Sequence, residues 1–358
     1  QTIIDLTTLS AAQGFIIQGD TTGDLAGYSV SLAGDVNGDG YADVIIGAIG
    51  ADGGGSGAGG AYVIFGSANG FGVPDGVGRQ VIDLTSLTAA EGFIIQGDMT
   101  SDRAGDSVSS AGDVNGDGID DLVVGAPRSD GSAFDSGEAY VLFGSTTGFG
   151  TADGAGRQVI DLSTLSAAQG LIIRGHDVRD YAGVSVSSAG DVNGDGFDDL
   201  IVGASGGGGG GARAGDSYVV FGSATGFGTA DGTGRQVIDL SSLTVGQGFI
   251  IQGDEAGDGA GRVSSAGDIN GDGFDDLVVG ARAGSDGGFL AGEAYVVFGG
   301  SGSFGSTDGT GRPVIDLTSL TASQGFVIQG DMPSDFAGAS VSSAGDVNGD
   351  GFDDLIVG

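Results

Sequence analysis

The sequence of 358 residues contains no cysteine, lysine or tryptophan, and it has a single histidine, His176. Without cysteine the chain forms neither disulfides nor thiol-based sites. All eleven basic residues are arginine, against 48 acidic residues, and the formal net charge is −37. Because nucleic acid and anionic membrane surfaces repel such a chain, we expect neither as a partner. The absence of a long apolar run predicts no membrane insertion.

A catalytic function is not expected from these residues. His176 stands where the corresponding segments carry aspartate, and it has no cysteine or lysine to work with, so we interpret it as an isolated variant in a turn rather than a general base. Paired carboxylates could in principle form a glycosidase site. The aspartates, however, recur alike along the chain, whereas a catalytic pair is expected once. The sequence therefore predicts a protein that is not an enzyme.

The most informative feature present is a nine-residue loop, Asp-x-Asn-Gly-Asp-Gly-x-x-Asp, that occurs five times. The copies begin at Asp35, Asp113, Asp191, Asp268 and Asp346. Calcium is a hard cation that takes six to eight oxygen ligands, and this spacing supplies them from positions one, three, five and nine, with a backbone carbonyl from position seven. The two glycines allow so short a backbone to curl around one ion. The sequence predicts about five calcium ions.

Each of the five loops supplies five predicted ligands, and the fourth residue of each set donates its backbone carbonyl. They are Asp35, Asn37, Asp39, Tyr41 and Asp43; Asp113, Asn115, Asp117, Ile119 and Asp121; Asp191, Asn193, Asp195, Phe197 and Asp199; Asp268, Asn270, Asp272, Phe274 and Asp276; and Asp346, Asn348, Asp350, Phe352 and Asp354.

The loop could also be an EF-hand or an ordinary surface turn. An EF-hand requires a carboxylate at position twelve and a helix on either side, but position twelve is Ile46 in the first copy and Val124 in the second. An apolar run that reads as a short buried strand follows each loop. Asp-Gly and Asn-Gly pairs also make ordinary surface turns. Five copies in register favour calcium over this second interpretation.

The loops recur at intervals of 78, 78, 77 and 78 residues, which indicates stacked or radially arranged units. Each unit has four strand-like runs separated by glycine-rich turns, and in the second unit these are residues 107–112, 122–126, 139–143 and 170–173. Four short strands per unit predict the blade of an all-β β-propeller, with the calcium loop between strands one and two. Residues 159–170, between the third and fourth runs, suggest one short helical turn with a Ser or Thr cap.

The repeated pattern is Ser-Val-x-x-Ala-Gly-Asp-x-Asn-Gly-Asp-Gly-x-x-Asp-Leu-x-Val-Gly-Ala, followed by Gly-x-Ala-Tyr-Val-x-Phe-Gly. It resembles the FG-GAP repeat of integrin α-subunit propellers and of many bacterial extracellular proteins. The resemblance covers essentially the whole chain and implies the propeller fold and calcium binding, but no particular integrin ligand. The fourth unit has lost one residue at Gly261-Arg262-Val263, which predicts a local shift of its first strand.

We expect one propeller domain over residues 1–358. Its units are residues 20–97, 98–175, 176–253, 254–330 and an incomplete 331–358, preceded by a closing strand within 1–19. In a closed five-bladed ring, residues 14–18 become the outer strand of the last blade and one third strand is missing. That strand could be disordered, absent or supplied in trans, and the chain could equally be a fragment of a longer array.

Open calcium loops have extracellular affinities, roughly 10⁻⁴–10⁻³ M, so a secreted or cell-surface location is favoured. No signal peptide or lipid-attachment motif is recognisable, and a start at Gln1 is compatible with processing. Two functions stay open: adhesion or recognition of a protein or cell-surface partner, and a structural subunit that self-associates in an extracellular layer or filament. The predicted contact surface is the face away from calcium, which carries the loops at 48–60, 126–138, 204–216 and 281–293.

Overall fold

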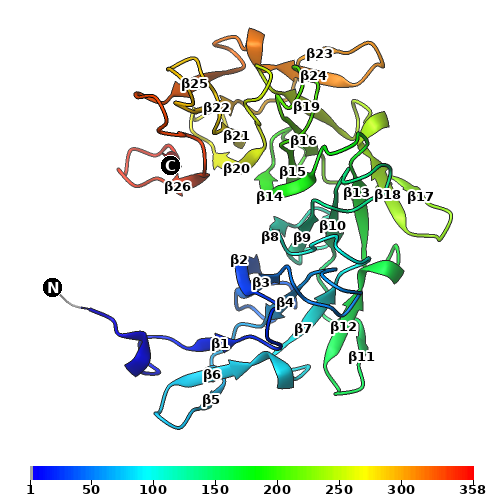
Figure 1. The fold of residues 1–358 in the computed structure, drawn as a ribbon, viewed down its shortest axis with the longest axis vertical. Helices are drawn as coiled ribbons and strands as arrows, with labels where there is room; N and C mark the ends of the chain where they lie inside the picture. The colour runs from blue at the N-terminus through cyan, green and yellow to red at the C-terminus, as the bar shows by residue number, and fades with distance from the viewer. Residues whose placement is uncertain (1–2) are drawn as a thin grey trace.

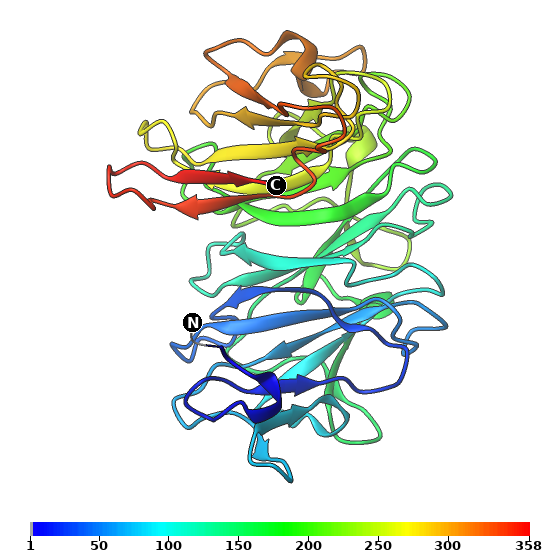
Figure 2. The same cartoon turned by 60° about the vertical axis from the view of Figure 1, so that its left-hand side comes forward.

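The computed structural model describes residues 3–358 as an all-β molecule whose sheets follow one another around an open arc (Figure 1). The strands that come first in each unit lie on the inner side of the arc, and the later strands lie outward. Seen after a turn of the molecule, the sheets lie beside one another in chain order (Figure 2). This arrangement is that of propeller blades around an axis, as the four-strand repeat predicts.

Each full blade is an antiparallel meander of four strands. The first strands are β2 (Ala26–Gly34), β8 (Ser107–Gly112), β14 (Ala182–Gly190), β20 (Arg262–Gly267) and β26 (Val341–Gly345). The second strands are β3 (Asp43–Ala48), β9 (Asp121–Ala126), β15 (Asp199–Ala204), β21 (Asp276–Ala281) and β27 (Asp354–Val357). The third strands are β4 (Gly60–Ile64), β10 (Glu138–Leu142), β16 (Asp216–Val220) and β22 (Glu293–Val297). The fourth strands are β7 (Gly92–Gln96), β13 (Gly170–Arg174), β19 (Gly248–Gln252) and β25 (Gly325–Gln329).

The core lies within and between the blades. The second and third strands of the second blade are buried along their whole length, because their apolar side chains pack on both faces of the sheet. Ile45 and Ile95 of the first full blade belong to the same hydrophobic cluster as Val124 and Tyr140 of the next one. The apolar side chains of this cluster therefore join the first two full blades.

The segment between the third and fourth strands differs from its prediction. It forms a two-stranded hairpin whose second strand pairs in parallel with the fourth strand of the preceding blade, as β12 does with β7. The hairpins are β5 (Val73–Pro74) with β6 (Gln80–Asp83), β11 (Thr151–Ala152) with β12 (Gln158–Asp161), β17 (Thr229–Ala230) with β18 (Gln236–Asp239), and β23 (Ser306–Thr307) with β24 (Pro313–Asp316). Each unit thus extends the sheet of the unit before it.

A short helical turn does follow each hairpin, but it is a 3-10 turn, and its cap is aspartate rather than Ser or Thr. In the second unit the Asp161 side chain accepts a hydrogen bond from the backbone N–H of Ser163. The turns are η1 (Leu6–Thr8), η2 (Leu84–Ser86), η3 (Leu162–Thr164), η4 (Leu240–Ser242) and η5 (Leu317–Ser319). Aspartate is a stronger cap than threonine and satisfies the free N–H of the turn.

The expected ring closure is not met among residues 3–358. The N-terminal strand β1 (Ile16–Gln18) pairs in parallel with β6, and the last sheet contains β26 and β27. In Figure 1 these two ends lie on opposite sides of the opening of the arc. The physical reason lies in the pairing of β1. It pairs with β6 in the way that β7 pairs with β12 in the next unit, so the first unit and not the last satisfies the hydrogen bonds of its backbone.

The lost residue in the fourth unit is absorbed locally. Val263 pairs with Val279 as Val108 pairs with Val124 in the second unit, so the register of the first strand is kept. The change is confined to Gly261, which has a φ of 159° where Gly105 has 85°. The shift that the sequence predicted is therefore restricted to the residue that precedes the strand.

Candidate metal-binding loops

All five loops lie between the first and second strands of their blades, as the sequence predicts. In the second loop Asp113 lies at the centre of the turn. One of its carboxylate oxygens accepts from the N–H groups of Gly116 at 2.7 Å and Asp117 at 3.0 Å, and the other accepts from Gly118 at 2.8 Å. Gly116 and Gly118 have φ values of 74° and 87°, a conformation that glycine adopts without a Cβ penalty. The first carboxylate thereby shapes its own loop.

The closing residue of the loop, Asp121, is fully buried. Its Oδ2 accepts from the N–H of Val114 at 3.1 Å, and its Oδ1 accepts from that of Gly144 at 2.8 Å. Burial raises the pKa of Asp121 to about 8, and the negative charges of Asp117 and Asp113 add to the effect. The same residue in the third loop, Asp199, is raised to about 8 for the same reason. These carboxylates are held in surroundings that favour a nearby positive charge.

The donors of each loop suit a hard cation, since they are carboxylate, amide and carbonyl oxygens and include neither nitrogen nor sulfur. The three carboxylates of a loop are nevertheless not gathered tightly. Among residues 3–358, one group of three acidic or imidazole side chains has its ligand atoms within 4.8 Å of one another. This group is His176, Asp177 and Asp180, which lie outside the five loops. The fit of each loop to a cation therefore rests on the donor chemistry and the loop shape.

A contact between units escaped the sequence analysis. The backbone N–H of Asp35, the first residue of loop one, donates to Oδ2 of Asp120 at 2.7 Å, and Asp120 is the eighth residue of the next loop. The contact recurs at every later junction between loops. The other pairs are Asp113 with Asp198 at 2.8 Å, Asp191 with Asp275 at 2.9 Å, and Asp268 with Asp353 at 3.1 Å.

On the opposite face, the arginines of the linker hairpins form ion pairs with the aspartate four residues earlier. The pairs are Arg79 with Asp75 at 2.8 Å, Arg157 with Asp153 at 2.9 Å, Arg235 with Asp231 at 3.3 Å, and Arg312 with Asp308 at 2.9 Å. Two of these arginines also reach an aspartate at the start of the blade that their hairpin extends: Arg157 contacts Asp20, and Arg235 contacts Asp98 at 2.6 Å. These two ion pairs therefore fasten the hairpins of Arg157 and Arg235 to the preceding blades.

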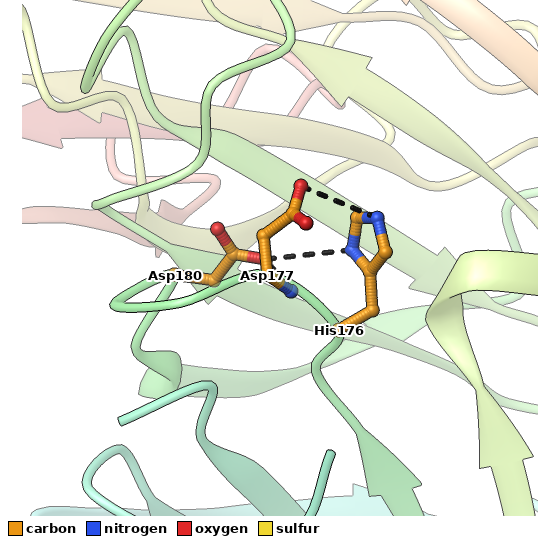
Figure 3. A group of neighbouring side chains, drawn as sticks. All are labelled: His176, Asp177 and Asp180. Carbon is orange, nitrogen blue, oxygen red and sulfur yellow. Dashed lines mark hydrogen bonds and ion pairs between the residues drawn. The ribbon is translucent and has the colours of Figure 1, made fainter. Parts of the chain in front are cut away.

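His176 interrupts this series, because it occupies the position of Asp20 and Asp98 in the blade that Arg312 reaches. Figure 3 shows each nitrogen of its ring facing a carboxylate, with Nε2 3.3 Å from Asp177 and Nδ1 3.5 Å from Asp180. The Asp180 interaction and the charge of Asp177 raise the pKa of His176, against burial and the charge of Arg312. The arrangement is that of a local ion pair.

A cavity of about 290 Å³ lies on the same face of the first full blade, and Asp20, Tyr62 and Arg157 contribute to its wall. The third strand of this blade begins with Gly60, whereas the next blade has Glu138 there, bonded to Arg174 at 2.8 Å. Because Gly60 has no side chain, the cavity stays open in the first full blade, whereas Glu138 occupies the corresponding position in the next blade.

The loops between the second and third strands carry exposed aromatic residues on this face. Phe134 is 56% exposed and Phe289 is 72% exposed. The guanidinium of Arg179 lies over the Phe134 ring, 5.6 Å from its centre. Such contacts hold an aromatic side chain in place at a loop tip, where it remains accessible.

Comparison with known proteins agrees with this architecture. The family model for the FG-GAP repeat matches residues 26–64, 104–142, 182–220, 260–297 and 337–358. The chain carries five FG-GAP repeats. Each matched segment begins at or just before the first strand of a blade, and the first four run through the third strand. The FG-GAP repeat is thus the inner part of the blade, with the aspartate-rich loop near its centre.

This FG-GAP chain is also 30% identical, over 187 residues, to integrin alpha-5 of Xenopus laevis. The match covers 51% of the chain and 15% of that protein. The relative is therefore far longer than the part it shares. No helix of residues 3–358 is long and apolar enough to span a membrane.

Proposed function

We propose that this FG-GAP chain is a calcium-stabilised propeller segment with a role in extracellular adhesion or protein recognition, and that it is not an enzyme. The observation that carries the proposal is the repeated loop, in which the first aspartate accepts several backbone N–H groups and presents oxygen donors at fixed spacing. The likeness to an integrin α subunit supports the extracellular setting.

In each loop, the residues at positions one, three, five and nine and the carbonyl at position seven would hold the ion. A bound calcium ion supplies positive charge among carboxylates that otherwise repel one another. Asp121 and its equivalents connect this site to the fold, because they begin the second strands and accept N–H groups from the loops on either side. Metal binding is therefore linked to folding of the blade.

The recognition surface proposed is the face opposite the calcium loops. Phe134 and Phe289 supply exposed aromatic contact area, which is enriched in protein interfaces. Once binding to an isolated extracellular protein is measured, a Phe134→Ser, Phe289→Ser double variant should weaken it. Val77→Ser in an exposed hairpin serves as the control, and equal binding by all three proteins would exclude this face.

The alternative, a structural subunit assembled in trans, has one observation in its favour. The last sheet has two strands among the described residues, and Ile356 on β27 is exposed. An unpaired strand edge of this kind accepts further strands. Light scattering after size exclusion in millimolar calcium distinguishes the two functions, since a monomer supports recognition and calcium-dependent polymers support assembly.

Native mass spectrometry tests the calcium proposal directly. The chain should retain up to five calcium ions, and Asp117→Ala should remove one of them. If the untreated chain bound none in millimolar calcium, the proposal would fail.

A further inference from the structure

We propose that the eighth residue of a loop positions the metal site of the preceding loop. The residues are Asp120, Asp198, Asp275 and Asp353. The inference rests on the proposed calcium function. It assigns a role to four carboxylates that lie outside the predicted ligand sets, and it makes each metal site depend on two successive units.

The first observation is the bond itself. Asp120 accepts the backbone N–H of Asp35 at 2.7 Å, across 85 residues of sequence. Asp35 is the residue whose side chain organises loop one, through the N–H groups of Asp39 at 3.0 Å and Gly40 at 2.8 Å. Asp120 therefore fixes the start of the loop from which the first ligand projects. Groups that orient metal ligands typically change metal affinity 10–100-fold when they are removed.

The second observation is the glycine that precedes each loop. Gly34 has a φ of 76°, and a Cβ built on it would lie 2.4 Å from the Asp120 carboxylate. A Cβ built on the corresponding glycines would likewise clash with the aspartate Oδ2 atom. The distances are 2.3 Å for Gly112 and Asp198, 2.2 Å for Gly190 and Asp275, and 2.1 Å for Gly267 and Asp353. The backbone is therefore shaped at every junction to admit the carboxylate of the next unit. Gly345 has no following unit among residues 3–358, and a Cβ built on it would have no other atom within 4 Å.

The third observation is the exception in the first unit. The eighth position of loop one is Ala42, although this loop has the same residues at positions one, three, five and nine as the other four loops. If Asp120 served its own loop, loop one would need an aspartate at position 42 as well. The pattern points to a role across the junction.

Loop one offers a specific reporter for the test. Tyr41 is the seventh residue of that loop, whereas the other loops have Ile119, Phe197, Phe274 and Phe352 there, and the chain has no tryptophan. Terbium(III) prefers the same oxygen ligands as calcium, and its luminescence is excited by energy transfer from a nearby tyrosine. The difference between the wild type and Tyr41→Phe in a terbium titration therefore isolates the occupancy of loop one.

In this titration Asp120→Ala should weaken terbium binding at loop one about tenfold or more. Asp120→Asn, which keeps an oxygen acceptor for the Asp35 N–H, should recover most of that loss. Asp353→Ala removes the same residue type from a distant junction and should leave the Tyr41 signal unchanged. Adding Ala42→Asp to Asp120→Ala, which restores a carboxylate within loop one itself, should not restore binding. Circular dichroism confirms that each variant is folded.

The outcomes separate the two proposals. If the wild type gave no Tyr41-dependent signal, loop one would not bind the metal and the proposed function would fail at that site. If the wild type bound terbium but Asp120→Ala behaved as Asp353→Ala does, the positioning role would be refuted. Recovery by Ala42→Asp would also refute it, because general negative charge would then account for the effect.

Discussion

At the scale of single residues, position 176 shows how one substitution changes a repeated contact. In two other blades an aspartate at this position meets a linker arginine, whereas His176 faces Arg312 with its own charge balanced by Asp177 and Asp180. The pKa of His176 is raised by this arrangement. A residue with a raised folded pKa stabilises the fold fully below its unfolded pKa, and this contribution is lost as the pH rises through the folded pKa.

We therefore predict that His176→Asp removes a component of stability that is lost as the pH rises above about 6.5, the ordinary pKa of histidine. The aspartate should instead pair with Arg312 at all pH values above the carboxylate range. Because the ion pairs of His176 are only partly buried, the free energy of unfolding should change by about 1 kcal/mol or less. Thermal unfolding across this pH range measures it, and identical pH profiles for the two proteins would contradict the assignment.

The proposed ligand residues could be named from the sequence because each set lies within nine consecutive residues. The positioning carboxylates could not, because Asp120 and Asp35 are 85 residues apart and meet through the packing of two blades. A signal was nevertheless present. Aspartate recurs at the eighth position in four loops, and only Ala42 departs from it.

At the scale of elements, the linker hairpin is the part that the sequence did not reveal. A strand of four residues, Gln158–Asp161, has no periodicity of its own that separates it from a turn. Its pairing with β7 is parallel and joins different units, so only the folded arc brings the two strands together. The four antiparallel strands of a blade, by contrast, were predicted within one residue of their bounds in the second unit.

Ile160 tests the contribution of this hairpin, because its side chain is buried opposite Ile95. Ile160→Ala should lower the free energy of unfolding by about 2–4 kcal/mol through the cavity it leaves. Val77→Ala, at an exposed position of the first hairpin, should change it by less than about 0.5 kcal/mol. Chemical denaturation compares them, and equal effects would mean that the hairpin does not pack on the preceding blade.

At the scale of the whole molecule, the inner strands show that blades stabilise one another along the arc. Val108 is 6% exposed, while the corresponding Val30 of the first full blade is 64% exposed. Val108→Asp should destabilise the protein by about 3 kcal/mol or more, because it buries an unpaired charge. Val30→Asp should be nearly neutral. Comparable losses in unfolding experiments would contradict the blade order described here.

The central claim is that calcium in the five loops stabilises the propeller. The most direct measurement is thermal unfolding of the full chain, first in millimolar calcium and then with excess chelator. Because a ligand that binds the folded state stabilises it by mass action, the account predicts a clearly higher melting temperature with calcium and a loosened or unfolded chain without it. The same melting temperature under both conditions would contradict the account.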